Sequence, residues 1–168
     1  MHLIEKVHAV MLSGGSAYGL DTAGGAMQYL EEKKIGIDTG SALVPIVPTA
    51  IIYDLAVGNA NIRPDKEMGY QACRDSSTEK PNQGNWGAGT GASVGKIFGM
   101  GHAMKGGFGT SSMDIGGNVI LGAAAVVNPF GDVVDYKNRG ILAGARGFEK
   151  LPLSIGEKGY FANTLSVM

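Results

Sequence analysis

Lys96 is the charged residue whose sequence setting best suits chemistry. It ends a glycine-rich stretch, residues 87–96, which reads Gly-Ala-Gly-Thr-Gly-Ala-Ser-Val-Gly-Lys. A lysine among small residues can be partly desolvated, which lowers its pKa or strengthens its effect on a neighbouring group. The alternative is an ordinary solvated loop lysine, and the residue type alone favours this second interpretation.

Tyr53 and Asn128 are two further polar side chains that could serve a reaction. Tyr53 lies near the end of an apolar segment, and its hydroxyl either donates to a developing oxyanion or lies at the rim of a strand, which is the commoner role. Asn128 precedes Pro129, as in many turns, yet its side chain carries both a carbonyl and an amide. The residue types leave both choices open.

Nucleotide-binding motifs fail at specific positions. A Walker phosphate loop requires Gly where Thr90 stands and a hydroxyl residue where Ile97 stands. The looser dinucleotide pattern matches Gly87, Gly89 and Ala92, but it follows a polar loop instead of a strand. A phosphate-ligand binding module on this stretch is therefore the weakest of the functions considered.

Two familiar catalytic arrangements are also absent from the pattern. Residues 15–19 resemble a nucleophile elbow, but the second glycine comes one position too late after Ser16, so we expect Ser16 to cap a helix instead. His2, His8 and His102 show neither metal-ligand nor triad spacing. None of these residues is a predicted catalyst or ligand.

Composition argues against several classes of function. The formal net charge is −1 and no basic run occurs, so neither nucleic acid nor a membrane surface is an expected partner. The single cysteine, Cys73, excludes a disulfide framework or a thiolate metal cluster, and a reducing compartment, by default the cytoplasm, is expected. We expect no metal and no cofactor, and no apolar run approaches membrane-spanning length. A small molecule or peptide is the expected partner.

The first half of the chain predicts strands and helices in alternation. Residues 7–12 form an apolar run typical of a buried strand. Residues 17–34 carry apolar side chains at helical spacing, with Gly36 as a left-handed stop. A strand over 50–55 and a second helix over 64–74 follow.

The second half is expected to be mainly sheet. Apolar segments predict antiparallel strands over 108–115, 119–127 and 132–135. Residues 116–118 and 128–131 are the expected turns between them. The sequence thus predicts an α/β protein without an internal repeat.

Seven blocks of the sequence form a pattern in a fixed order. Residues 14–21 read Gly-Gly-Ser-Ala-Tyr-Gly-Leu-Asp, and residues 126–135 read Val-Val-Asn-Pro-Phe-Gly-Asp-Val-Val-Asp. The other blocks are residues 3–10, 44–48, 53–55, 87–96 and 106–112. Taken together, these stretches resemble the DmpA-like family of L-aminopeptidases/D-esterases. This family of self-processing, N-terminal-nucleophile-type peptidases includes β-aminopeptidases and nylon-oligomer hydrolases.

The resemblance implies a fold and a set of roles. The implied fold is an αββα sandwich of the DmpA/ornithine-acetyltransferase type, incomplete here, with residues 1–168 forming a single domain that is mostly the first subunit. By the same resemblance Tyr53 and Asn128 contact the tetrahedral oxyanion, and Lys96 lies near the nucleophile. A homo-oligomer is also implied.

The nucleophile implied by the resemblance comes from self-cleavage. Family members cut themselves before a Ser or Thr, and Asn163-Thr164 resembles this cleavage site. Thr164 would then be the nucleophile and residues 164–168 the start of the second subunit, whereas the alternative for this segment is an unrelated tail. A freed α-amine with a pKa near 8 can take the hydroxyl proton, so no histidine is needed.

We therefore expect an amide or peptide-bond hydrolase of the aminopeptidase type, acting on a small peptide or an amino-acid amide. Most of the second subunit is missing from the sequence, so we expect no activity from this chain alone. The alternative is a non-catalytic truncated remnant or an oligomerising structural fragment. The preference for D- or L-, α- or β-amino substrates is not predictable from these residues.

Overall fold

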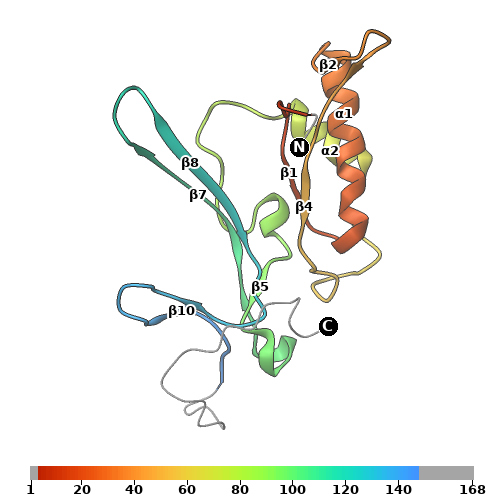
Figure 1. Ribbon diagram of the computed structural model, residues 1–168. Coiled ribbons are helices and arrows are strands. Elements are labelled where there is room, and N and C mark those ends of the chain that lie inside the picture. Colours follow the sequence, from red (N-terminus) through yellow and green to blue (C-terminus); the bar gives the residue numbers. More distant parts are fainter. Residues whose placement is uncertain (1–3, 148–168) are drawn as a thin grey trace. The chain divides into compact units, whose positions relative to one another are not determined.

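The computed structural model describes residues 4–147, which fall into two compact units divided between residues 82 and 83. Helices and short strands occur together, so the α/β class is confirmed (Figure 1). The prediction of a single domain over residues 1–168 stays a prediction. Among the described residues, no helix combines the length and the apolar character needed to cross a membrane.

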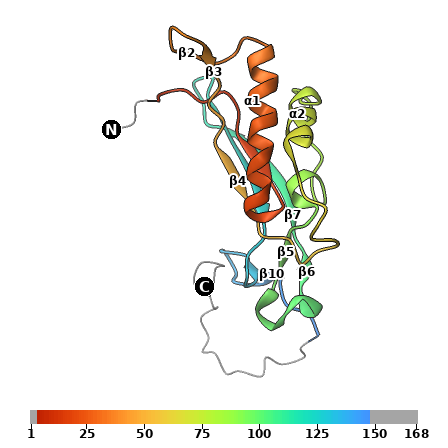
Figure 2. The same cartoon turned by 90° about the vertical axis from the view of Figure 1, so that its right-hand side faces the viewer.

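The first unit contains a parallel strand pair with a helical crossover. Strand β1 (Met11–Ser13) pairs in parallel with β4 (Thr49–Ile51), and helix α1 (Thr22–Glu32) lies between them in sequence. Strands β2 (Ile37–Asp38) and β3 (Leu43–Val44) form a small antiparallel pair after α1. Helix α2 (Lys66–Arg74) ends the unit and lies beside α1 in both views (Figures 1 and 2).

Prolines shorten the first strand. The predicted strand at residues 7–12 begins only at Met11, although His8 N–H already donates to Ile46 O in the opposite segment at 2.9 Å. Pro45 and Pro48 in that segment have no N–H to donate. The ladder therefore becomes regular only where β4 begins.

Ser16 does not cap the helix, contrary to the prediction. Its φ is 56°, and its N–H donates to Ile52 O at 3.0 Å. A 3₁₀ turn, Ser16–Asp21, then precedes α1, whose first residue Thr22 donates its hydroxyl to Gly19 O at 2.7 Å. A tertiary bond toward the end of β4 thus takes the place of the local cap.

The helix stop is also displaced from the predicted residue. Lys34, with φ 59°, takes the left-handed position, and its N–H bonds to Glu31 O while that of Ile35 bonds to Leu30 O, the pattern of a Schellman motif. Gly36 has a different purpose. A Cβ there would lie 2.8 Å from the backbone of Val44, so this glycine allows β3 to approach closely.

Glycines also allow α1 and α2 to pack at backbone distance. A Cβ on Gly25 would lie 1.9 Å from Lys66 O, and one on Gly69 would lie 2.0 Å from Thr22 O. Gly24, next in sequence, has only ordinary contact at 3.8 Å from the Lys66 side chain. The contact between the helices therefore depends on two particular glycines.

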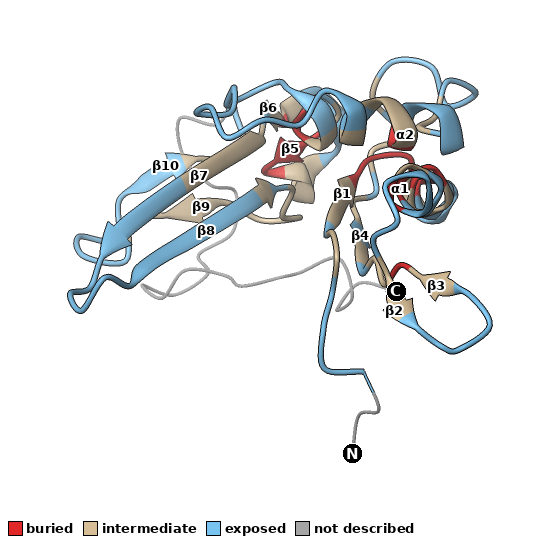
Figure 3. Ribbon diagram, turned by 90° about the horizontal axis from the view of Figure 1, so that it is seen from above, coloured by how far each residue is buried: buried red, intermediate tan, exposed pale blue. Residues whose placement is uncertain are grey.

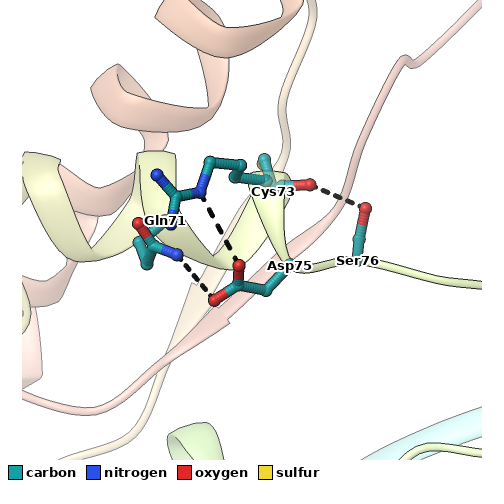
Figure 4. Close-up of polar contacts among 5 residues, drawn as sticks. Gln71, Cys73, Asp75 and Ser76 are labelled. Atoms are coloured by element: carbon teal, nitrogen blue, oxygen red, sulfur yellow. Dashed lines mark hydrogen bonds and ion pairs between the residues drawn. The ribbon is translucent and has the colours of Figure 1, made fainter.

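Helix α2 is capped at both ends. Asp65 accepts from a first-turn N–H at 2.9 Å, an interaction that contributes about 1 kcal/mol. At the other end Ser76 donates its hydroxyl to Cys73 O and Gln71 donates to Asp75, each at 2.7 Å (Figure 4). The predicted helix over 64–74 is confirmed, beginning two residues later.

The described part of the second unit, residues 83–147, contains three antiparallel strand pairs and three 3₁₀ turns. The pairs are β5 (Ser93–Val94) with β6 (Met104–Lys105), β7 (Gly107–Asp114) with β8 (Ile120–Val127), and β9 (Val133–Val134) with β10 (Ile141–Ala143). The 3₁₀ turns are Gly87–Gly89, Lys96–Phe98 and Met100–His102. Ala92, Val94 and Ala103 supply its buried apolar side chains.

Residues 128–131 do not form the predicted turn of a hairpin. They leave β8 and run along the 93–96 segment, with Gly95 N–H donating to Gly131 O at 2.8 Å. Strand β9 consequently pairs with β10, a strand that the sequence pattern did not predict. This diversion brings Asn128 to Lys96.

The β7–β8 hairpin is the longest strand pair among the described residues, with eight residues in each strand, and confirms the prediction for 108–127. It is also widely exposed (Figure 3). Ile120 is 71% exposed, Met113 61% and Leu121 58%. Because neighbouring residues of a strand point to opposite faces, Ile120 and Leu121 expose apolar surface on both faces of the hairpin.

Candidate functional site

Lys96 donates three hydrogen bonds from its ammonium group. Nζ lies 2.9 Å from Ser93 O, 3.0 Å from Asn128 O and 2.9 Å from Asn128 Oδ1. An ammonium has three N–H donors, so these acceptors use all of them. Lys96 is half-buried and is not the solvated loop lysine that its residue type alone favoured.

The side chain of Asn128 has a defined orientation. Its Oδ1 accepts from Ser93 N–H at 2.9 Å as well as from Lys96 Nζ. Both neighbours are donors, so the atom that faces them must be the oxygen. The amide nitrogen of Asn128 therefore lies on the other side of the group, as two N–H donors.

The surroundings act on the pKa of Lys96 in two ways. Burial lowers the pKa of its amine from the ordinary value of 10.5, since desolvation disfavours the charged form. The three oxygen acceptors act in the other direction, because each accepts a hydrogen bond from the ammonium and so favours the charged form. The pair thus joins a cation to an oriented amide.

Local sequence explains how the two segments meet. Ser93 lies in β5 and is 4% exposed, and Gly95 follows it with φ 68°, which turns the chain so that Lys96 points back toward Ser93 O. Lys96 N–H also donates to Phe130 O at 2.7 Å. Backbone and side-chain bonds together hold Lys96 against the segment that carries Asn128.

Tyr53 follows β4 in the first unit and is 52% exposed. Its neighbours are fixed on both sides: Ile52 N–H donates to Ser13 O at 3.0 Å, and the Asp54 carboxylate accepts from Gly15 N–H at 2.7 Å. A Cβ on Gly14 would lie 2.3 Å from Asp54 Oδ2, so the Gly14-Gly15 pair makes room for this carboxylate. The backbone that carries Tyr53 is held by the loop after β1.

The structure brings Lys96 and Asn128 together, whereas Tyr53 belongs to the other unit. The meeting of Tyr53 with this pair stays a prediction. Asn163 and Thr164, the expected cleavage site and nucleophile, lie outside the described residues.

The histidines of the described part have structural contacts. His8 Nδ1 accepts from Ile46 N–H at 3.0 Å, and His102 Nδ1 lies 2.9 Å from Arg146 O. In residues 4–147 no three His, Cys, Asp or Glu side chains are placed to hold a metal ion.

Two contributors to these arrangements were missed in the sequence. Ser93 acts through its backbone, which no residue type reveals. Asp54 had a usable signal, because it stands directly after Tyr53 and a glycine pair lies next to the end of the predicted first strand.

Comparisons with known proteins add an independent finding. A model of Peptidase family S58 matches residues 1–150. An uncharacterised aminopeptidase of Mycobacterium tuberculosis is 46% identical over 132 residues, which cover 79% of this chain and 36% of that protein. One from Mycobacterium leprae is 44% identical over 139 residues, with the same coverage.

A relative with a named reaction also matches. The 6-aminohexanoate-oligomer endohydrolase of Paenarthrobacter ureafaciens is 35% identical over 135 residues, which cover 76% of this chain and 35% of that enzyme. The chain thus spans little more than a third of the length of these curated relatives.

Proposed function

This chain belongs to Peptidase family S58, and from that premise we propose that it forms part of an amide-bond hydrolase of the aminopeptidase type. The observation that carries the proposal is the orientation of Asn128. Ser93 N–H and Lys96 Nζ hold its Oδ1, which fixes the direction in which its two amide N–H donors point. Fixed donors of this kind stabilise the tetrahedral intermediate of acyl transfer.

The proposed reaction uses a self-generated N-terminal threonine or serine. Its hydroxyl oxygen attacks the substrate carbonyl carbon, and its proton passes to the free α-amine and then to the leaving amine. Water hydrolyses the resulting ester in a second step. Thr164, exposed by a cut after Asn163, is the proposed nucleophile, and Tyr53 and Asn128 are the proposed oxyanion donors.

The proposed fold of the complete hydrolase is the αββα sandwich. Strand β8 supports it, because all of its side chains are apolar and they alternate between two faces. Such a strand is typical of a sheet that is covered on both sides. We therefore place β7 and β8 among the inner strands of the sandwich.

Further polypeptide of the family fold is the proposed partner. The chain spans 36% of the mycobacterial relatives, and the exposed hairpin offers apolar area for what completes it. Assembly into a homo-oligomer, a small peptide or amino-acid amide as substrate, and a cytoplasmic location belong to the same proposal.

A chimera tests the function directly. Residues 1–150 replace the matched region of the P. ureafaciens endohydrolase, and hydrolysis of 6-aminohexanoate oligomers and of aminoacyl p-nitroanilides is measured. The chimera is expected to hydrolyse at least one of these substrates. Within it, Asn128→Asp and Tyr53→Phe are each expected to lower kcat by roughly 10²–10³-fold. An active chimera in which neither substitution lowers kcat would contradict the assigned roles.

The purified chain alone is the necessary comparison. It is expected to release no p-nitroaniline, since the residues around the nucleophile come from further polypeptide. Robust release by the chain alone would refute that dependence.

A non-catalytic remnant or an oligomerising fragment is the second candidate, and the exposed apolar hairpin is the observation that favours it. Mass spectrometry separates the two. A cut between Asn163 and Thr164, or a second polypeptide that co-purifies, supports the hydrolase, whereas an uncut chain that only self-associates supports the remnant.

A phosphate-binding module on residues 87–96 receives no support from the geometry. All three donors of the Lys96 ammonium already bond to protein oxygens. A nucleotide titration is expected to produce no thermal shift.

A further inference from the structure

Gly95 and Lys96 lie between two segments of the second unit. On one side Gly95 N–H donates to Gly131 O and Lys96 N–H donates to Phe130 O, at 2.8 and 2.7 Å. On the other side a Cβ on Gly95 would lie 2.1 Å from Ala145 N. Gly95 is buried, so the segment at residues 144–145 packs directly on the backbone that carries Lys96.

The carboxylate of Asp132 ties these two segments together. Its Oδ1 accepts from Ala145 N–H at 2.9 Å. Gly144 is buried against the same group, since a Cβ there would lie 2.2 Å from that oxygen. Asp132 is also the next residue after Gly131, whose carbonyl holds Gly95 from the opposite side.

We propose that Asp132 is a positioning residue, which keeps the Lys96 ammonium on Asn128 by holding the 144–145 segment over Gly95. The catalytic meaning of this role rests on the proposed function, but the geometric role does not. All three acceptors of Lys96 belong to Ser93 and Asn128, so a small movement of the Gly95 backbone withdraws the ammonium from all of them at once.

Two substitutions distinguish the hydrogen-bond acceptor of Asp132 from the negative charge of its carboxylate. Asp132→Asn keeps an oxygen that can accept from Ala145 N–H, and Asp132→Ala removes it. Gly144→Ala disturbs the same contact from the other side, by placing a methyl group against the carboxylate. Asp135→Ala is the matched control, because the carboxylate of Asp135 also accepts from a backbone N–H, that of Lys137 at 2.8 Å within its own turn.

The readout is the pH titration of the Lys96 side chain by NMR of ¹³C-lysine-labelled chain, with the signal assigned by Lys96→Arg. Burial holds the Lys96 pKa below its ordinary value. Asp132→Ala and Gly144→Ala are expected to raise it toward the ordinary lysine value of ~10.4, since the amine regains water. Asp132→Asn and Asp135→Ala are expected to leave it unchanged.

Three results would overturn the inference. They are an unchanged Lys96 titration in both Asp132→Ala and Gly144→Ala, an equal shift in Asp135→Ala, and an Asp132→Asn variant that behaves like Asp132→Ala. Circular dichroism identifies a variant that fails to fold. If either Asp132→Ala or Gly144→Ala does so, the Lys96 titration of the other variant tests the inference. The titration involves no substrate, so its failure is distinct from a failure of the proposed hydrolase.

Discussion

Lys96 Nζ and Asn128 Oδ1 lie 2.9 Å apart although 32 residues of sequence separate them. The bond fixes which end of the Asn128 amide faces the lysine, so the two N–H donors of that amide point away from Nζ.

The stability of this contact can be tested on the chain alone. Asn128→Ala removes Oδ1, which leaves the buried Ser93 N–H and one ammonium donor without their acceptor, and should lower the free energy of unfolding by about 1–3 kcal/mol. Asn128→Asp keeps both acceptor positions and should change it by less than about 1 kcal/mol. Denaturant unfolding measures both, and equal losses would show that Oδ1 does not matter.

Lys96→Met removes three hydrogen bonds at once. We expect a loss of about 1–3 kcal/mol in the free energy of unfolding, because the carbonyls of Ser93 and Asn128 lose their donor. Lys105→Met is the control: this lysine is exposed and donates to Thr90 O, so a change within about 0.5 kcal/mol is expected. A control that loses as much as Lys96→Met would contradict the special role of Lys96.

The lowered pKa of Lys96 also predicts how stability changes with pH. Above its folded pKa and below the unfolded value of 10.5, the unfolded chain binds this proton more tightly than the folded chain. The contribution of Lys96 to the free energy of unfolding should therefore rise with pH in that window and stay constant below it. The difference between the unaltered chain and Lys96→Met, measured from neutral pH to 10.5, gives the sign, and a difference that falls with pH would be inconsistent with desolvation.

Adjacent glycines of α1 should respond in opposite ways to alanine. Gly25→Ala places a methyl group against Lys66 O, so the helices must separate, and a loss of more than about 2 kcal/mol is expected. Gly24→Ala meets only ordinary contact and should stabilise the helix by up to about 1 kcal/mol. Thermal unfolding of the two variants side by side checks this, and similar melting temperatures would argue against the close contact of α1 and α2.

The apolar hairpin predicts association of the isolated chain. Replacing Ile120 and Leu121 with lysine puts charge on both faces of β8 and should shift the chain toward monomer in analytical ultracentrifugation. Ser112→Lys adds one charge to β7 without removing apolar surface and serves as the control. An unaltered chain that is already monomeric at high concentration would show that this surface does not drive assembly.

Sequence reasoning succeeded where the determinants are local. The hairpin over residues 108–127 was predictable because apolar residues and a Gly-Gly-Asn turn stand next to each other in sequence. Helix α2 was predictable because Pro64 and the apolar residues Met68 and Ala72 have helical spacing. Sequence reasoning failed where a contact with a residue distant in sequence determines the local structure. Ser16 does not cap the helix because its N–H bonds to Ile52 O. Gly36 does not end the helix but allows the backbone of Val44 to pack closely against it.

The candidate site shows the same division. Residue types and family resemblance selected Lys96 and Asn128, but their mutual orientation depends on Ser93 N–H, a backbone group that has no signature in sequence. The contact of Asp132 with Ala145 is equally invisible, because an aspartate after glycine suggests a turn and nothing more.

Strand β8 has a consequence for the cell that makes this protein. It is eight residues long, carries no charge, and within the described residues its only sheet neighbour is β7, so its outer backbone can template the addition of another strand. Surplus copies would then join one another into aggregates. We therefore expect the amount of this chain in the cell to be a condition of its solubility.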